Sequence, residues 1–409
     1  MGAHVCGDLS LDHGDPRMLE QRPDSASATA DTVNREGDPG DTEKEEDRTA
    51  LPPQAPLDYF LPPMARAFLD KILRLQLLAA EDADDFLKRN LASWPGYLGA
   101  KELGRALVAG SLLTQYQLDR FLAGRAHGLL LGNHRVLERL GAGGMGVVFL
   151  AEHVYMKRRV AIKVLAIDDH SDPALLSRFY AEMQVLASLH HPHIVTAFDS
   201  GHVPSPDGRQ EALLYLAMEL VEGGDLEIYV QKHGAADIGT ACGWIAQAAA
   251  GVQEAHDHHL IHRDIKPSNL LLTRERQVKV VDFGLAQQSN LRQTSRGAVL
   301  GTIDFMPPEQ SLDSSSVGVA ADIYGLGATL FWILTKEPPY PRAQTIREAM
   351  DQLQETPARS LRGLRPDIPP DLEAFVKTML DRDPARRPAL PITVSRILSG
   401  FGGFRNASN

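Results

Sequence analysis

His262-Arg263-Asp264-Ile265-Lys266-Pro267-Ser268-Asn269 is the segment from which the fold of this chain can be inferred, and Asp282-Phe283-Gly284 follows it, with Asp282 eighteen positions after Asp264. Together they supply a candidate base, a cation and two oxygen ligands for a metal. Phosphoryl transfer needs such a set: a group that orients the attacking hydroxyl, positive charge near the phosphoryl group, and ligands for magnesium. We therefore expect Asp264 to act as the base and Lys266 to stabilise developing negative charge. Asn269 and Asp282 are expected to bind Mg²⁺, a hard cation that prefers oxygen ligands.

A glycine-rich motif lies upstream, in Gly141-Ala142-Gly143-Gly144-Met145-Gly146-Val147-Val148. Glycines let the backbone turn tightly and approach phosphates closely. Dinucleotide-binding folds use a similar glycine pattern, but there a helix follows the glycines. Here the residues Val147–Leu150 are apolar and partly β-branched, which favours a strand. The better interpretation is therefore a strand-turn-strand lid over phosphates.

A lysine follows in an otherwise apolar strand, expected over Arg159–Leu165. Burying the ammonium of Lys163 is costly unless an anionic partner or ligand is present. Glu182 lies nineteen residues further on, in a segment expected to be helical over Ser177–Leu189. We predict a Lys163–Glu182 ion pair that positions Lys163 against the α and β phosphates. The alternative is an exposed lysine and an unrelated surface glutamate.

The segment Leu214–Val221 reads as a strand that runs into the turn Glu222-Gly223-Gly224-Asp225. Such a crossing between two lobes can offer backbone groups to an adenine ring. We expect Met218 to lie beside the base, and Glu219 and Val221 to offer backbone hydrogen bonds. Asp225 is expected to contact a ribose hydroxyl.

Strands come first in this part of the chain and helices later. Apart from the helical segment Ser177–Leu189, short strands are expected over residues 132–221, the first lobe. The second lobe, over residues 222–400, is expected to be mostly helical from Asp225 on, apart from the loop region 262–312. This order predicts an α+β fold in which a β-rich lobe is followed by an α-rich lobe. The cleft between two lobes is a common ligand site. Residues 401–409 are expected to be a frayed tail.

The chain before residue 132 divides in two. Residues 1–56 are rich in Asp, Glu, Gly, Pro, Ser and Thr, lack apolar periodicity and are expected to form a disordered tail. Apolar residues at helical spacing then predict a small helical module over 57–131. Its expected helices are Met64–Leu78, Glu81–Leu91, Lys101–Val108 and one that ends at Gly124. Thr114, with Gln117 three positions later, forms a capping box that opens this last helix.

A weak internal repeat runs through the helical module. At an offset of 35, Leu77-Leu78 matches Leu112-Leu113, and Phe86-Leu87 matches Phe121-Leu122. One interpretation is a pair of helix-loop-helix units that form a docking or regulatory module. The other is chance similarity between amphipathic helices. So few residues bury only a modest core, and packing onto the next domain is therefore expected.

Composition excludes several classes of protein. Residues 1–48 hold thirteen Asp and Glu and five Lys and Arg, and so carry most of the formal charge of −11. No basic stripe stands out, which argues against nucleic-acid binding. The cysteines are Cys6 and Cys242, a pattern that favours a reducing cytoplasm over a disulfide framework. No run of about 20 apolar residues predicts a membrane span. The histidine-rich stretches lack convincing ligand spacing, so zinc is not expected.

From His134 to Leu398 the chain resembles the protein kinase superfamily, specifically the serine/threonine kinases of eukaryotic type found in bacteria. The glycine loop, Lys163, Glu182, HRD, Asn269 and DFG occur in the family's order. Lys266, in the form DIKPSN, matches the serine/threonine branch. Residues 301–310, GTIDFMPPEQ, resemble the GTxxYMAPEQ stretch of bacterial members but carry different residues at 305 and 307. The leader around residues 112–124 resembles, more weakly, leaders of planctomycete-type kinases.

The resemblance implies a bilobal kinase fold, ATP and Mg²⁺ as cofactors, and protein substrates. It implies an ion pair between Glu309 and Arg387, and an Asp322 that braces the catalytic loop from a buried helix. The residues implied to contact ATP are Leu140, Gly141, Ala142, Gly143, Gly144, Met145, Gly146, Val148, Ala161, Lys163, Glu182, Met218, Glu219, Val221, Asp225 and Leu271.

Regulation is indicated by Arg263, because an arginine before the base can pair with a phosphate on the activation segment. Thr294 and Ser295 are the candidate phosphorylation sites, by autophosphorylation in trans that requires self-association. The alternative is that these polar loop residues are never modified. A catalytically dead ATP-binding scaffold is the second function considered, and intact Lys163 and Asp264 argue against it. Residues 57–131 are expected to bind a docking partner, and the protein is expected to be cytoplasmic.

Overall fold

The computed structural model describes residues 61–143, 146–167, 173–204, 212–283, 303–312 and 317–402. Some expectations lie outside these ranges: the tail 1–56, Gly144 and Met145 of the glycine loop, and the candidate phosphorylation sites Thr294 and Ser295. Within the described ranges, no helix is long and apolar enough to cross a membrane. The same ranges contain no cluster of three or more His, Cys, Asp or Glu residues arranged to hold a metal ion.

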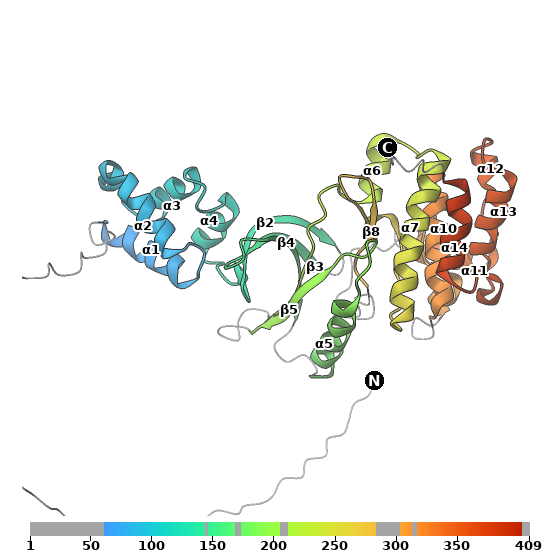
Figure 1. Ribbon diagram of the computed structural model, residues 1–409, viewed down its shortest axis with the longest axis horizontal. Coiled ribbons are helices and arrows are strands. Elements are labelled where there is room, and N and C mark those ends of the chain that lie inside the picture. Colours follow the sequence, from blue (N-terminus) through green and yellow to red (C-terminus); the bar gives the residue numbers. More distant parts are fainter. Residues whose placement is uncertain are drawn as a thin grey trace, which may run out of the picture. The chain divides into compact units, whose positions relative to one another are not determined.

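The helices before the sheet, α1 to α4 in Figure 1, are called here the N-terminal helices. They bury a cluster of apolar side chains of their own. They are α1 Pro63–Arg74, α2 Ala80–Arg89, the short 3-10 helix Leu91–Gly96, α3 Ala100–Ala109 and α4 Gln115–Leu122. Phe68 and Ile72 of α1 point into this cluster and are almost fully buried. Sequence periodicity therefore located all four α-helices within a few residues of their ends.

The end of α1 differs most from the prediction. The helix was expected to reach Leu78 but ends at Arg74. Gln76 adopts a left-handed backbone with φ of 52°, a conformation that cannot continue a right-handed helix. Leu77 and Leu78 remain buried after this turn, and so they contribute apolar periodicity without being helical.

An antiparallel sheet follows, with the strand order β1-β2-β3-β4-β6-β5 among the described residues. Its strands are β1 Leu130–Leu131, β2 His134–Gly143, β3 Gly146–His153, β4 Arg159–Ile167, β5 Ala197–Val203 and β6 Ala212–Met218. The helix α5, Pro173–Ser188, packs beside β5. A strand and not a helix follows the glycines, which confirms the expected strand and excludes a dinucleotide-binding arrangement. The role of the hairpin as a lid over phosphates stays a prediction.

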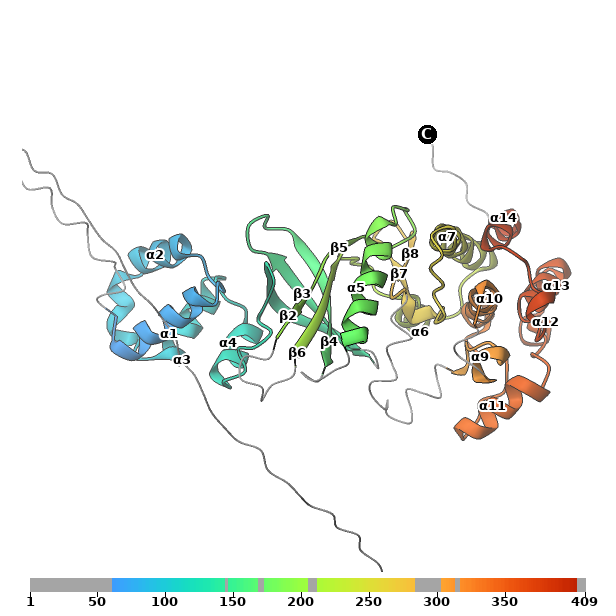
Figure 2. The ribbon, with the colours of Figure 1, turned by 90° about the horizontal axis from the view of Figure 1, so that it is seen from below.

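The remaining chain is mostly helical. Its helices are α6 Leu226–His233, α7 Ile238–Asp257, α9 Pro308–Leu312, α10 Val319–Thr335, α11 Ile346–Glu355, α12 Leu361–Leu364, α13 Pro370–Met379 and α14 Pro391–Phe401. A small hairpin of β7 Leu270–Leu272 and β8 Val278–Val280 lies between α7 and α9 in sequence. The helices α7, α10 and α14 lie side by side (Figures 1 and 2).

The helix α10 forms the centre of this helical layer. Its sequence is apolar on nearly every face, which is typical of a helix buried on all sides, and most of its residues are buried. A glycine allows one close approach: a Cβ on Gly325 would lie 2.8 Å from the backbone oxygen of Ile265. The catalytic loop therefore rests directly on α10, whose position is fixed by the core.

Candidate active site

The loop that carries the HRD sequence is anchored by one buried carboxylate. Asp322, in the first turn of α10, is 1% exposed. Its Oδ2 accepts a hydrogen bond from the backbone N–H of His262 at 2.9 Å, and its Oδ1 accepts one from the N–H of Arg263 at 2.7 Å. His256 of α7 contacts the same carboxylate through Nε2 at 2.7 Å. The predicted brace between Asp322 and the catalytic loop is confirmed.

The contacts of Asp322 hold Arg263 in an unfavourable backbone conformation. Arg263 has a φ of 67°, a left-handed conformation that is uncommon for a residue with a side chain and persists only where surrounding contacts fix it. The carboxylate of Asp322 provides those contacts on one side. On the other side, Gln310 of α9 donates its Nε2–H to the carbonyl oxygen of Arg263 at 3.2 Å. Sequence reasoning did not identify Gln310 or His256 as part of this support.

His262 occupies a structural position between the HRD loop and the segment after β8. The side chain is fully buried, its Nε2 lies 2.8 Å from the carbonyl oxygen of Val281, and its ring packs edge-on against Phe283 with centroids 4.7 Å apart. These contacts tie the catalytic loop to the segment that carries Asp282. Packing and hydrogen bonding are therefore the roles that the structure gives to His262.

The three residues expected to act on the phosphoryl group lie within hydrogen-bonding distance of one another. Lys266 Nζ is 2.8 Å from Asp264 Oδ2. Asn269 donates from Nδ2 to the backbone oxygen of Asp264 at 2.7 Å and to Asp264 Oδ2 at 3.2 Å. The amide nitrogen of Asn269 is therefore committed to Asp264, and its amide oxygen is the atom with the chemistry of a metal ligand.

Asp282 contacts the lysine of the sheet. Lys163, on β4, donates from Nζ to Asp282 Oδ2 at 2.7 Å, and its side chain is only 5% exposed. Asp282 itself has a φ of 71°, so its backbone, like that of Arg263, is held in an uncommon conformation. The sequence led us to expect Glu182 as the partner of Lys163. Glu182 lies on α5 and is half-buried; its pairing with Lys163 stays a prediction.

The glycine hairpin joins β2 to β3. Gly143 pairs with Gly146 at its tip. Gly146 has a φ of 144°, and a Cβ there would lie 2.4 Å from the backbone oxygen of Val164 on β4. A side chain at this position would push the hairpin off the sheet. Leu140, Gly141 and Ala142 are exposed along the hairpin, where they are available to a ligand.

The connection between sheet and helical layer is fixed at both ends. At its start the backbone N–H of Glu219 donates to Thr196 O at 2.9 Å, and the carboxylate of Glu219 pairs with Lys279 at 2.9 Å. At its end the N–H of Gly223 donates to Leu272 O at 3.0 Å. Because the N–H of Glu219 is committed, its carbonyl is the backbone group that could face an adenine. The Glu219–Lys279 pair was not foreseen from the sequence.

Asp225 has a second task besides the predicted ribose contact. Its Oδ1 accepts the N–H of Ile228 at 2.8 Å and caps the N-terminus of α6. Partial burial raises the pKa of Asp225 above its ordinary value, although hydrogen bonds from backbone N–H groups oppose the rise. Burial likewise raises the pKa of neighbouring Glu227, with the negative charge of Asp225 as a second cause. The ribose contact stays a prediction.

A buried ion pair anchors Glu309, in the segment that follows the activation loop, to Arg387. Arg387 donates from Nη1 and Nη2 to the two carboxylate oxygens of Glu309, at 2.7 and 2.8 Å. The Arg387 side chain has no exposed surface, and its guanidinium also lies 5.0 Å from the ring centroid of Tyr324. The predicted Glu309–Arg387 pair is confirmed, in the bidentate geometry that makes such pairs strong.

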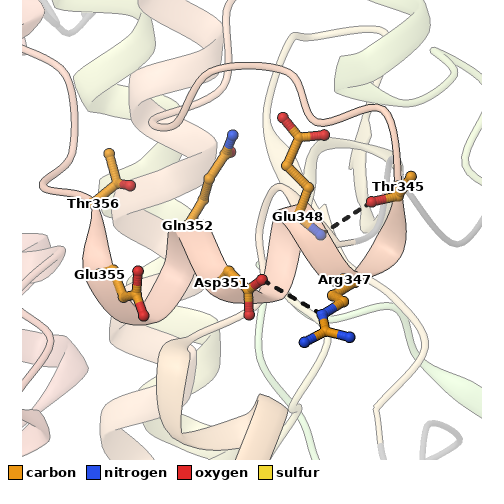
Figure 3. Close-up of a pocket in the computed structure, with 7 residues that line it drawn as sticks. All are labelled: Thr345, Arg347, Glu348, Asp351, Gln352, Glu355 and Thr356. Atoms are coloured by element: carbon orange, nitrogen blue, oxygen red, sulfur yellow. Dashed lines mark hydrogen bonds and ion pairs between the residues drawn. The ribbon is translucent and has the colours of Figure 1, made fainter.

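A surface cavity lies elsewhere, along α11 (Figure 3). It is lined by Thr345, Arg347, Glu348, Asp351, Gln352, Glu355 and Thr356. The side chains are polar and stand along one helix, and Arg347 pairs loosely with Asp351 at 3.9 Å. None of the residues expected to contact ATP or metal lines this cavity, and we do not regard it as the nucleotide site.

Residues 134–397 match the family model described as "Protein kinase domain". The chain belongs to the protein kinase family. Among curated relatives, this kinase-family chain is 37% identical over 253 residues to the serine/threonine-protein kinase PknB of Mycolicibacterium smegmatis, covering 61% of this chain and 40% of PknB. It is 34% identical over 258 residues to PrkC of Bacillus subtilis, covering 63% of this chain and 38% of PrkC.

A third relative, PknA of Mycobacterium tuberculosis, is 34% identical over 259 residues, covering 63% of this chain and 58% of PknA. The chain thus spans between about two fifths and three fifths of the length of these relatives. Among solved structures, the kinase domain of Mycobacterium tuberculosis PknI, in a form with one cysteine replaced by alanine, aligns with a TM-score of 0.52 and 27% identity. That alignment covers 68% of this chain and 98% of the PknI kinase domain. The expected fold, a β-sheet lobe followed by a helical lobe, is confirmed.

Proposed function

We propose that this chain is an active serine/threonine protein kinase, which transfers the γ-phosphate of ATP to serine or threonine hydroxyls of proteins. One observation carries the proposal: Asp264, Lys266 and Asn269 meet within hydrogen-bonding distance on a loop fixed to the core. In this arrangement the Asp264 carboxylate orients the acceptor hydroxyl and takes its proton. Lys266 places positive charge beside the same oxygen, where it stabilises the charge that develops on the transferred group.

Magnesium is the metal that the donor set fits. Asn269 offers an amide oxygen because its nitrogen faces Asp264, and Asp282 offers a carboxylate that already attracts the cation Lys163. Oxygen donors of this kind suit a hard divalent cation. Mg²⁺, when bound there with ATP, would neutralise charge on the β and γ phosphates. Lys163 is proposed to contact the α and β phosphates, with Glu182 as its partner.

The remaining predicted contacts with ATP follow from the same arrangement. The exposed glycine hairpin is proposed to cover the phosphates. Met218, at the end of β6, is proposed to lie beside the adenine. The backbone groups of Glu219 and Val221 are proposed to form hydrogen bonds with the adenine. The other apolar residues proposed to line the base are Leu140, Val148, Ala161 and Leu271.

Serine and threonine are the proposed acceptors. The support is the lysine two residues after Asp264, together with relatives that are named serine/threonine-protein kinases. The alternative is a nucleotide-binding scaffold without transfer. Incubation of the purified chain with Mg²⁺ and γ-labelled ATP, and with peptides that differ only in carrying Ser, Thr or Tyr, separates these functions. We expect label on the Ser and Thr peptides. Label on none of them would support the scaffold.

Phosphorylation of the activation segment is a further part of the proposal. The backbone of Arg263 is held in place by hydrogen bonds to Asp322 and Gln310. Its guanidinium is therefore attached to a fixed backbone position when it binds a phosphate. We propose Thr294 or Ser295 as the site, modified in trans within a transient pair of chains. A Thr294→Ala/Ser295→Ala chain should incorporate less phosphate and be less active. Unchanged incorporation and activity would contradict this part.

Three finer points belong to the same proposal. The N-terminal helices are proposed to form a separate module over 57–131, of the planctomycete-type leader kind, ahead of a kinase domain over 132–400. They are proposed to dock a partner that recruits or regulates the kinase. The protein is proposed to work in the cytoplasm. A pull-down with the full chain, compared with a chain altered at the exposed Met64 and Leu98, tests for a docking partner.

A further inference from the structure

Two residues of α4 and its cap hold the strand that leads into the glycine hairpin. We propose that Thr114 and Gln117 are positioning residues for nucleotide binding: through β2 they set the course of the hairpin that covers ATP. The proposal rests on the proposed function only in assigning that hairpin to ATP. It goes beyond the docking role proposed for the N-terminal helices, because it gives those helices a direct effect on the catalytic domain of the same chain.

The first observation is a capping box whose side chains serve twice. Thr114 Oγ1 accepts the N–H of Gln117 at 3.2 Å, and Gln117 Oε1 accepts the N–H of Thr114 at 2.9 Å. Gln117 also donates from Nε2 to the carbonyl oxygen of Val136 at 2.7 Å, and Thr114 Oγ1 donates to the carbonyl oxygen of Leu137. Gln117 is only 2% exposed. A helix cap alone needs neither bond to the strand.

The second observation is that these bonds meet β2 at an irregularity. In the pairing of β2 with β3, Val136 faces Ala151 and Glu138 faces Leu150, so Leu137 is an extra residue. Such a bulge bends its strand and takes the extra residue out of the regular ladder. The hydroxyl of Thr114 binds the carbonyl of this extra residue. The bend at Leu137, four residues before Gly141, is therefore fixed by the start of α4.

A second bulge follows at once. Arg139 faces Phe149 and Gly141 faces Val148, which leaves Leu140 as another extra residue. Leu140 is 49% exposed and is among the residues proposed to contact ATP. Because two bends follow each other within four residues, a small rotation at the first changes where Leu140 and the glycines point. The hydrogen bonds from Thr114 and Gln117 fix that rotation.

The third observation is that the helices hold the returning strand as well. The ring of Tyr116, on α4, packs against Phe149 on β3 with centroids 5.9 Å apart. Arg135 donates from Nη1 to Leu77 O at 2.8 Å, while its Nη2 pairs with Glu152 of β3 at 2.6 Å. Both strands of the hairpin are thus tied to the N-terminal helices.

The decisive variant is Gln117→Glu. A glutamate at this position of a capping box still accepts the Thr114 N–H, but its carboxylate cannot donate to Val136. Thr114→Val removes the hydroxyl at Leu137, whereas Thr114→Ser keeps it. Gln115→Ala is the matched control on the same helix, because Gln115 is exposed and its side chain donates to Asp119 within α4. Circular dichroism and thermal melting of each full-length chain establish that it is folded at the assay temperature.

The readouts are the affinity for a non-hydrolysable ATP analogue with Mg²⁺, and the separate kcat and KM values for ATP and peptide. We expect Gln117→Glu and Thr114→Val to weaken analogue binding and raise the KM for ATP about two- to tenfold, the range for one lost hydrogen bond. The KM for peptide should stay unchanged, and Thr114→Ser and Gln115→Ala should match the unaltered chain. If the Gln117→Glu chain does not fold, the test is the comparison of analogue affinity between the Thr114→Val and Thr114→Ser chains.

Analogue affinity in both variants equal to that of the unaltered chain would overturn the proposal, because a helix cap without influence on the hairpin predicts that result. An equal loss in Gln115→Ala would overturn it too. The analogue measurement needs no phosphoryl transfer. A chain that binds the analogue but labels no peptide would therefore refute the proposed kinase activity and leave this inference to be judged on the affinities. A chain that binds no nucleotide would overturn both.

Discussion

Lys163 Nζ lies 2.7 Å from Asp282 Oδ2, and this bond joins the central strand β4 to the residue proposed to hold magnesium. Lys163 is buried in the sheet, which restricts its side chain. Asp282 has a left-handed backbone, which restricts the direction of its carboxylate. The bond shows that the residues proposed to bind phosphate and metal meet within one hydrogen bond.

Lys163→Met should abolish most transfer while leaving the fold intact. Methionine fills a similar volume, so the sheet keeps its packing, but the positive charge near Asp282 and the phosphates is lost. We expect kcat/KM to fall by at least about 100-fold, as when one fixed electrostatic contact to a transition state is removed. Steady-state kinetics with ATP and a serine peptide measure this. Lys157→Met, on the exposed turn between β3 and β4, is the control and should keep full activity.

Asp322→Ala should destabilise the catalytic loop. The carboxylate accepts the N–H groups of His262 and Arg263, and each buried donor left without a partner costs about 1–3 kcal/mol. We expect the free energy of unfolding to fall by a few kcal/mol, with activity lost beyond what the stability change explains. Urea unfolding combined with kinetics measures both. A stability loss below about 1 kcal/mol would show that the loop does not depend on this brace.

Arg387→Lys tests the buried ion pair with Glu309. Lysine keeps the charge but cannot form the paired hydrogen bonds of the guanidinium, and breaking a buried pair costs about 3–5 kcal/mol. We expect a loss of about 2–4 kcal/mol in the free energy of unfolding, because the charge is retained. Arg386→Lys is the matched control, because Arg386 is mostly exposed and lies 3.5 Å from Asp383; it should change stability by less than about 0.5 kcal/mol. Equal effects of the two substitutions would contradict this prediction.

The raised pKa of Asp304 should make the free energy of unfolding depend on pH. Burial raises the pKa of Asp304 to about 6, although the positive charges of Arg342 and Arg359 oppose the rise. The folded protein therefore holds this proton at pH values where the unfolded chain has lost it, and the contribution of Asp304 to stability declines as pH rises from about 4 to 6. Asp304→Asn should be more stable relative to the unaltered chain at about pH 7.5 than at about pH 4.5. Urea unfolding at the two pH values measures this, and equal differences would contradict it.

The sequence predicted the elements that depend on local pattern. The capping box of Thr114 and Gln117 and the strand after Gly146 follow from short-range spacing, and the structure contains both. The Asp322 brace and the Glu309–Arg387 pair join residues far apart in sequence. They were predictable only because the chain resembles a known family.

Contacts that depend on the detailed course of the backbone were not predictable. The left-handed Gln76 ends α1 early, although Leu77 and Leu78 continue the apolar pattern. Lys163 contacts Asp282, whose backbone is left-handed, and local sequence alone does not assign that conformation to a particular aspartate. Likewise, an alternating strand pattern does not reveal the extra residue at Leu137, which is the residue that Thr114 binds.

The proposed function is tested most sharply by γ-phosphate transfer in the Asp264→Asn chain. Asparagine matches aspartate in size, so the fold should be kept and the affinity for an ATP analogue should match that of the unaltered chain. It lacks the carboxylate, and positioned acid–base groups contribute about 100- to 10,000-fold to rate. We predict that transfer to a serine peptide, measured with Mg²⁺ and γ-labelled ATP, falls by at least about 100-fold. Transfer at the unaltered rate would contradict the assignment of Asp264 as the base.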